Sequence, residues 1–197
     1  EDKPFAKYMA CQFMFGMGNL MITAPLIVVL ANQFSFDYLG EILIVSTIPI
    51  ILMPVSIPIW SKLLSRMHVI KFRSIHSWVF VLSSICFGLS VLLGSTVGLW
   101  IAAAIRGVGF GGGVLAWNLG HHDFAPLEQS GRYMGLHVTL TGIRGLIAPA
   151  VGMGFYSLLQ GMGETTGGGV FLLGAAISAV GGVGFIVLSR SSQRKSG

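Results

Sequence analysis

Residues 97–119 decide the fold, and they read Val97-Gly-Leu-Trp-Ile-Ala-Ala-Ala-Ile-Arg-Gly-Val-Gly-Phe-Gly-Gly-Gly-Val-Leu-Ala-Trp-Asn-Leu119. A bilayer core of about 30 Å is crossed by roughly 20 residues of helix, so this stretch is long enough to span it. Its one charged residue, Arg106, lies near the middle. The stretch therefore predicts a membrane-spanning helix that carries a cation deep in the bilayer.

The composition of the whole chain gives the same indication. Hydrophobic residues make up 53% of the 197 residues and charged residues only 10%, with a mean hydropathy of +0.80. This leaves too little polar surface to cover a soluble domain, so the bilayer is the expected solvent. The net charge of +5 does not indicate a nucleic-acid partner, because the basic residues cluster beside apolar stretches.

Five further stretches are as long and as apolar as the first. Gly and Pro inside them are compatible with spanning helices, where neighbouring helices satisfy the backbone. We therefore predict an all-α, polytopic membrane protein with one domain over residues 1–197. Its six transmembrane helices are expected at about residues 5–31, 39–60, 74–93, 97–119, 134–159 and 168–188.

The basic residues indicate the orientation of the chain. With six spans, ten of the twelve Lys and Arg residues fall on one set of links and termini, while the opposite links hold Asp37, Glu41 and Glu164. Loops that stay in the cytoplasm keep the basic residues. We expect a multi-pass protein of the cell (inner) membrane with both termini cytoplasmic. The ten residues are Lys3, Lys7, Lys62, Arg66, Lys71, Arg73, Arg132, Arg190, Arg194 and Lys195.

The other two arginines, Arg106 and Arg144, lie inside predicted spans. Each is about ten residues from a span end, which is roughly 15 Å at 1.5 Å per residue. An arginine facing lipid at that depth costs at least about 2.5 to 3.5 kcal/mol, so each side chain should face protein or a watery cavity. Two interpretations stay open: bonding to the carbonyls of broken helices, or contact with a substrate pathway.

Helical spacing places further residues beside the two arginines. One face of the fourth span carries Arg106, Phe110, Gly113 and Trp117, and one face of the fifth carries His137, Thr141, Arg144 and Ala148. The stripe of the fifth span is polar along half its length, which fits the wall of a water-filled cavity, or an interior network that is satisfied within the protein. The candidate substrate-binding residues are Arg106, Arg144, Asn19, Trp117, Asn118 and Thr141.

Small residues in the fourth and fifth spans indicate close helix crossings. Gly107 and Gly111 form a small-xxx-small pair, which lets two backbones approach. Gly145, Pro149 and Gly152 are the packing candidates in the fifth span. No Asp or Glu lies mid-span, and the His and Cys residues lack the spacing of a metal site. We expect no metal and no cofactor.

Three segments resemble motifs of the major facilitator superfamily. Residues 60–71, Trp-Ser-Lys-Leu-Leu-Ser-Arg-Met-His-Val-Ile-Lys, are similar to its loop motif G-x-L-a-D-R-x-G-R-k. Arg66 matches the motif's arginine, Lys62 lies four residues before it, and Ser65 stands at the acidic position. Residues 142–152, Gly-Ile-Arg-Gly-Leu-Ile-Ala-Pro-Ala-Val-Gly, are similar to its G-x-x-x-G-P-x-x-G pattern. Arg106 and the glycines after it resemble its R-x-x-x-G segment.

The resemblance implies one six-helix half of a secondary transporter that moves a small solute by alternating access against a second half. It implies a cavity lined by the first, second, fourth and fifth spans, and a gating role for Arg66 and Lys62. The start Glu1-Asp2-Lys3-Pro4 and the basic tail favour the carboxy-terminal half. A non-transporting assembly or sensor subunit remains an alternative. A membrane-embedded enzyme is a weaker one, because no Gly-x-Ser-x-Gly or His-box pattern lies in a span.

Overall fold

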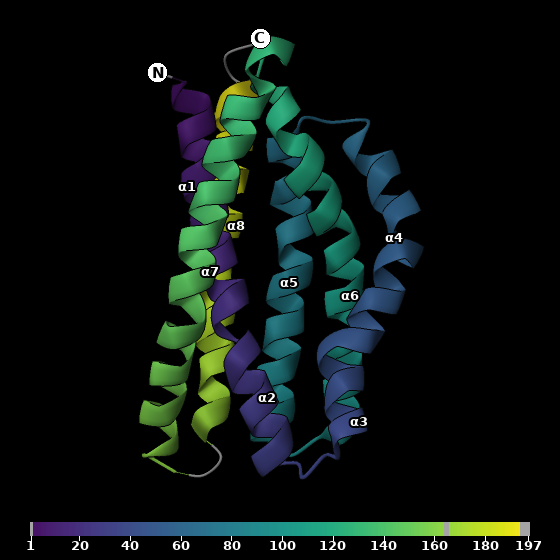
Figure 1. The fold of residues 1–197 in the computed structure, drawn as a ribbon, viewed down its shortest axis with the longest axis vertical. Helices are drawn as coiled ribbons and strands as arrows, with labels where there is room; N and C mark the ends of the chain where they lie inside the picture. Colours follow the sequence, from purple (N-terminus) through teal and green to yellow (C-terminus); the bar gives the residue numbers. More distant parts are fainter. Residues whose placement is uncertain (1, 164–165, 194–197) are drawn as a thin grey trace.

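In a computed structural model of the chain, residues 2–163 and 166–193 are described, and this part contains helices and connecting turns only (Figure 1). Six helices in it are long and apolar enough to cross a membrane, which confirms the predicted all-α fold with six spanning helices. The helices are α1 (Lys3–Met21), α2 (Thr23–Asn32), α3 (Tyr38–Ile42), α4 (Ile48–Leu64), α5 (Val69–Leu92), α6 (Thr96–Leu119), α7 (Ser130–Gln160) and α8 (Gly169–Gln193).

Short polar side chains begin several of these helices. Asp2 accepts a hydrogen bond from the Phe5 amide at 3.0 Å, Asp37 from the Gly40 amide at 2.8 Å, and Ser95 from the Gly98 amide at 3.2 Å. These caps satisfy amides that the first turn leaves without a partner. The third spanning helix begins at Val69, five residues before the predicted start, so the connection after α4 is shorter than expected.

Two spans are built from more than one helical segment. The first is interrupted at Ile22, between α1 and α2, three residues before Pro25. The second passes from α3 through a π-helical turn at Leu43–Thr47 into α4, which begins beside Pro49. Proline cannot donate the backbone bond of a regular helix, so irregular turns are expected beside it.

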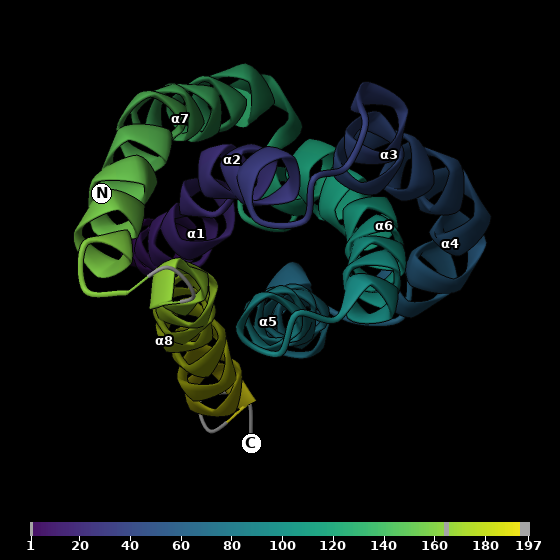
Figure 2. The same ribbon diagram turned by 90° about the horizontal axis from the view of Figure 1, so that it is seen from below.

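The helices pack in the order α4, α6, α5, α8, α1, α7, which Figure 2 shows as an open arc. The spans at the two ends of this arc are the least buried: only 17% of the most apolar window is buried in Tyr38–Leu64 and in Ser130–Gln160, against 44–56% in the other four. Large apolar side chains remain exposed on both, including Ile59 on α4 and Leu146 on α7. These two helices therefore present apolar faces to whatever surrounds the bundle.

Glycines allow the closest helix approaches. Cβ atoms at Gly107 and Gly111 of α6 would lie 2.8 Å from the Cα of Pro49 and 2.7 Å from the carbonyl oxygen of Met53 in α4. A Cβ at Gly152 of α7 would collide with the backbone of Met21, whereas Gly145 has open space around it. The α4–α6 and α1–α7 crossings thus depend on small residues, as close packing in membranes generally does.

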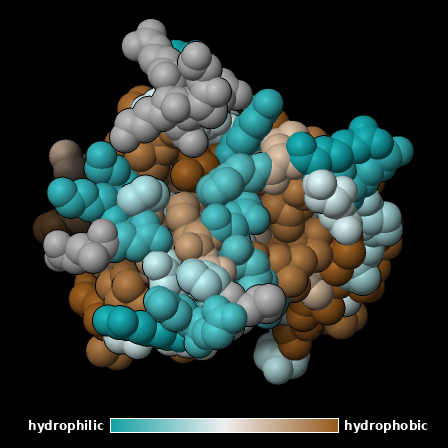
Figure 3. Space-filling view, turned by 90° about the horizontal axis from the view of Figure 1, so that it is seen from above, coloured by the Kyte–Doolittle hydropathy of each residue, from teal (hydrophilic) through white to brown (hydrophobic). Residues whose placement is uncertain are grey.

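The two ends of the bundle differ from its sides. α1 begins and α8 ends at the upper end in Figure 1, where the α4–α5 and α6–α7 connections also lie. Seen from that end, hydrophilic residues cover much of the face and hydrophobic residues surround it (Figure 3). Seven of the ten basic residues assigned to this side are exposed, namely Lys3, Lys7, Lys62, Arg66, Lys71, Arg132 and Arg190; Arg194, Lys195 and the opposing Glu164 lie outside the described residues.

Candidate functional site

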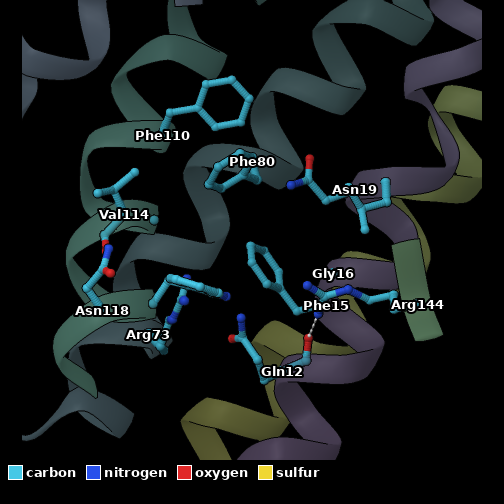
Figure 4. A pocket seen from close by; sticks show the side chains of 13 residues that line it. Gln12, Phe15, Gly16, Asn19, Arg73, Phe80, Phe110, Val114, Asn118 and Arg144 are labelled. Carbon is cyan, nitrogen blue, oxygen red and sulfur yellow. Dashed lines mark hydrogen bonds between the residues drawn. The ribbon is translucent and has the colours of Figure 1, made fainter. Parts of the chain in front are cut away.

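A pocket of about 230 Å³ opens between α1, α5, α6 and α7 (Figure 4). Aromatic rings and polar side chains alternate around it. The third span contributes residues to this pocket and the second contributes none, whereas the expected transport cavity included the second span and not the third. The lining residues are Gln12, Phe15, Gly16, Asn19, Leu20, Arg73, Phe80, Phe110, Gly113, Val114, Trp117, Asn118 and Arg144.

Arg144 enters the pocket from the middle of α7. Its side chain is buried, and Nη1 donates a hydrogen bond of 2.7 Å to the carbonyl oxygen of Gln12 on α1. The guanidinium packs directly over Gly16, the next turn of α1. Its Nε atom is buried without a hydrogen-bond partner. Nη1 of Arg144 therefore holds α1, whereas its Nε donates to no group in the described part of the chain.

Arg73 is the functional candidate that the sequence interpretation missed. It was placed in a cytoplasmic link, but the early start of α5 puts it in the second turn of that helix, 1% exposed and lining the pocket. Its guanidinium carbon lies 5.8 Å from the centroid of the Phe15 ring. The spacing of Arg73, His76, Ser77 and Phe80, all buried, is the helical signal that indicates an inward face.

His76 is hydrogen-bonded to Arg73. Its Nε2 lies 2.7 Å from the carbonyl oxygen of Gly109 on α6, and its Nδ1 lies 3.3 Å from Nη1 of Arg73. A carbonyl oxygen only accepts, so Nε2 carries the hydrogen and Nδ1 accepts one from Arg73. The imidazole is also enclosed by the rings of Phe72, Trp60 and Phe80. This arrangement fixes the direction of the Arg73 side chain.

Arg106 has a different environment from the other two arginines. It is buried and donates through Nη2 to the carbonyl oxygen of Asn19 at 3.4 Å and to Oγ1 of Thr23 at 3.2 Å. The Phe110 ring lies 5.6 Å from its guanidinium carbon. Arg106 is absent from the pocket lining. It bonds α6 to the interrupted first span on both sides of Ile22.

The remaining candidates lie in or next to the pocket. Asn19, Trp117 and Asn118 line it, and the Asn118 side chain donates to the Val114 carbonyl oxygen at 2.8 Å. The Asn19 Oδ1 atom is buried without a hydrogen-bond partner. Thr141 does not line the pocket, although its hydroxyl is also buried and unpartnered. His137, one turn before Thr141, packs against Trp117 with 5.6 Å between ring centroids.

The loop-motif residues lie apart from the pocket. Lys62 is exposed in the last turn of α4 and Arg66 is exposed in the turn after it. At the same end of the bundle, the Asp123 carboxylate accepts a hydrogen bond from the Val69 amide and lies 3.8 Å from His68, so it caps the start of α5.

The charged residues that line the pocket are all cationic. The pocket offers two guanidinium groups, and its lining includes no Asp or Glu. Among the described residues, the only pair within salt-bridge distance is His68–Asp123, so neither arginine is neutralised by a carboxylate there. The same part of the chain contains no group of three His, Cys, Asp or Glu that could hold a metal ion.

The fold is a six-helix membrane bundle, and its polar pocket extends from Arg144 in the middle of α7 to Arg73 and Asn118 near the helix ends at one side of the bundle. The family model of the Major Facilitator Superfamily matches residues 1–149, and the chain belongs to that superfamily. The match and the six apolar helices fit one six-helix half of such a protein. Comparisons with curated proteins and with solved structures gave no match.

Proposed function

We propose that the chain is one half of a secondary transporter that moves a small solute by alternating access, rocking against a second six-helix half. Members of the superfamily transport solutes, and the resemblance covers most of the chain. The pocket is the main support for the proposal. It contains Arg144, a buried cation in the middle of a spanning helix, whose Nε atom has no hydrogen-bond partner. Intramembrane charges are costly and usually mark a substrate pathway.

The exposed faces of α4 and α7 support a partner half. Both helices lie at the ends of the packing order and keep large apolar residues exposed. Lipid or a second bundle is the only suitable environment for such faces. In this arrangement the pocket lies beside the partner, and Arg144, Asn19, Trp117 and Asn118 contact the solute. Arg106 holds the backbone at Asn19, Thr141 does not contact the solute, and Arg66 and Lys62 act at the cytoplasmic gate.

The test is uptake of a labelled solute panel into proteoliposomes that contain the complete transporter. We expect at least one solute to accumulate, and Arg144→Ala to lower its uptake by about tenfold or more, because a charged hydrogen-bonding group is lost. Arg132→Ala is the matched control, an exposed arginine on the same helix. Absence of uptake for every solute, with both halves present and folded, would instead favour the non-transporting subunit.

A further inference from the structure

We infer that the pocket binds a small organic carboxylate with a flat apolar body, and that Arg73 and Arg144 supply the positive charge that attracts it. The inference deepens the proposed transport function by naming the substrate class, and it adds Arg73 to the binding residues. It rests on three features of the pocket: cations that no carboxylate neutralises, guanidinium Nε donors without an acceptor, and aromatic walls.

The charges exclude a cationic solute. Both arginines are at least 93% buried, with exposed fractions of 1% and 7%, and neither has a carboxylate within salt-bridge distance in the described part of the chain. A buried charge without a counter-ion is strongly unfavourable. An anion in the pocket would neutralise it, and arginine's planar fork suits a carboxylate because it can donate two parallel hydrogen bonds.

The arginines are positioned before any ligand arrives. His76 holds Nη1 of Arg73 and the Gln12 carbonyl holds Nη1 of Arg144, while the Nε atoms of both have no partner. Figure 4 shows the two residues on opposite sides of Phe15. Preorganised donors lower the ordering cost of binding.

The other residues that line the pocket indicate the shape and polarity of the rest of the ligand. Phe15, Phe80, Phe110 and Trp117 present rings to the pocket, which favours a flat apolar group through stacking. The volume of about 230 Å³ equals roughly seven or eight water molecules at about 30 Å³ each. This space is large enough for a molecule of benzoate's size. We assign the pocket to a soluble carboxylate, because the aromatic rings around it suit a flat apolar body better than a polar lipid headgroup.

Binding of benzoate to the complete transporter in phosphatidylcholine nanodiscs, measured by titration calorimetry, tests the inference. Benzyl alcohol and benzylammonium, which are similar in size to benzoate, serve as the neutral and cationic control ligands. We expect benzoate to bind and the other two to bind at least about tenfold more weakly. Arg73→Gln and Arg144→Gln should each weaken benzoate binding by about tenfold or more, whereas Arg132→Gln should leave it unchanged. Arg73→Lys, which keeps the charge and loses the fork, should give an intermediate affinity.

Two competition measurements distinguish a soluble carboxylate from free phosphate and from a lipid headgroup. Inorganic phosphate and nanodiscs that contain phosphatidylglycerol should compete weakly with benzoate; strong competition by the lipid would overturn the assignment to a soluble ligand. Equal binding of benzoate, benzyl alcohol and benzylammonium would overturn the inference even if another solute is transported. Arginine-dependent benzoate binding without uptake of any solute would instead leave the inference standing and remove the transport proposal. Monodisperse elution of each variant in size-exclusion chromatography confirms that it is folded.

Discussion

The guanidinium of Arg144 on α7 donates a 2.7 Å hydrogen bond to the backbone carbonyl oxygen of Gln12 on α1. One side chain thereby joins the outermost helix of the arc to a wall of the pocket. The contact is possible because Gly16, one turn further along α1, has no side chain in the way. The absence of a side chain at Gly16 therefore allows both the packing of α7 against α1 and the observed position of the Arg144 guanidinium.

Gly16→Ala should displace Arg144. A Cβ at residue 16 would lie 2.6 Å from the Arg144 Nε atom and closer still to the guanidinium carbon. Inside a helix, alanine is more favourable than glycine by up to about 1 kcal/mol, so the substitution does not by itself destabilise α1. A loss of benzoate affinity would therefore come from the collision with Arg144. We expect benzoate to bind at least about tenfold more weakly. Gly142→Ala on α7, where nothing lies within 4 Å, is the control. Equal affinities in the two variants would contradict the coupling.

Arg106→Gln should act mainly on stability. Its two hydrogen bonds connect α6 to Asn19 and Thr23, on either side of the break in the first span. Losing them leaves buried groups unsatisfied, at a cost of about 1 to 3 kcal/mol. We expect a lower unfolding temperature in detergent, with benzoate affinity reduced less than in Arg144→Gln. A variant that keeps its unfolding temperature but loses all binding would place Arg106 in the site.

His76→Phe tests whether His76 positions Arg73. The ring would remain among Phe72, Trp60 and Phe80, but the hydrogen bonds to Gly109 and Arg73 would be lost. A purely structural role predicts reduced stability alone. A positioning role also predicts that the ratio of the affinities for benzoate and benzyl alcohol falls by about 3-fold or more. Calorimetry on both ligands measures this ratio, and an unchanged ratio would argue against the positioning role.

The fold was predictable because span length and hydropathy depend on composition, which the sequence contains directly. The beginning of α5 was not. Lys71 and Arg73 lie two residues apart, and hydropathy treats both as loop residues, yet Lys71 is exposed and Arg73 is 1% exposed. Only the helical phase separates them, since Arg73 shares a face with His76 and Phe80 while Lys71 does not.

The site was predictable in part for a related reason. Spacing along α7 placed Arg144 on a polar stripe, and Arg144 does line the pocket. Spacing along α6 placed Arg106 beside Phe110, Gly113 and Trp117, yet those three line the pocket and Arg106 does not. Its partners come from the break at Ile22 in another span. A periodic pattern gives the face of one helix, but not the irregular backbone of the neighbour that receives the side chain.

The proposed orientation predicts which loops are reached from outside the cell. In a background with Cys11→Ser and Cys86→Ser, Leu93→Cys should react with a membrane-impermeant maleimide on intact cells. Ser65→Cys should react only after the membrane is permeabilised. Both positions are exposed and lie in turns at opposite ends of α5, so accessibility within the protein does not distinguish them. The reverse labelling pattern would place the termini outside, against the distribution of basic residues.

Gly152→Ala should weaken the α1–α7 crossing. A Cβ at residue 152 would lie 2.7 Å from the carbonyl carbon of Met21 and 3.0 Å from its Cα. These are backbone atoms in the last turn of α1, so no side-chain rotation relieves the collision. Overpacking of this kind costs about 1 to 3 kcal/mol. We expect a lower unfolding temperature in detergent than for Gly154→Ala, whose Cβ meets open space. If both variants unfold at the wild-type temperature, α7 moves away from α1 at no cost, and Gly152 is not needed for the crossing.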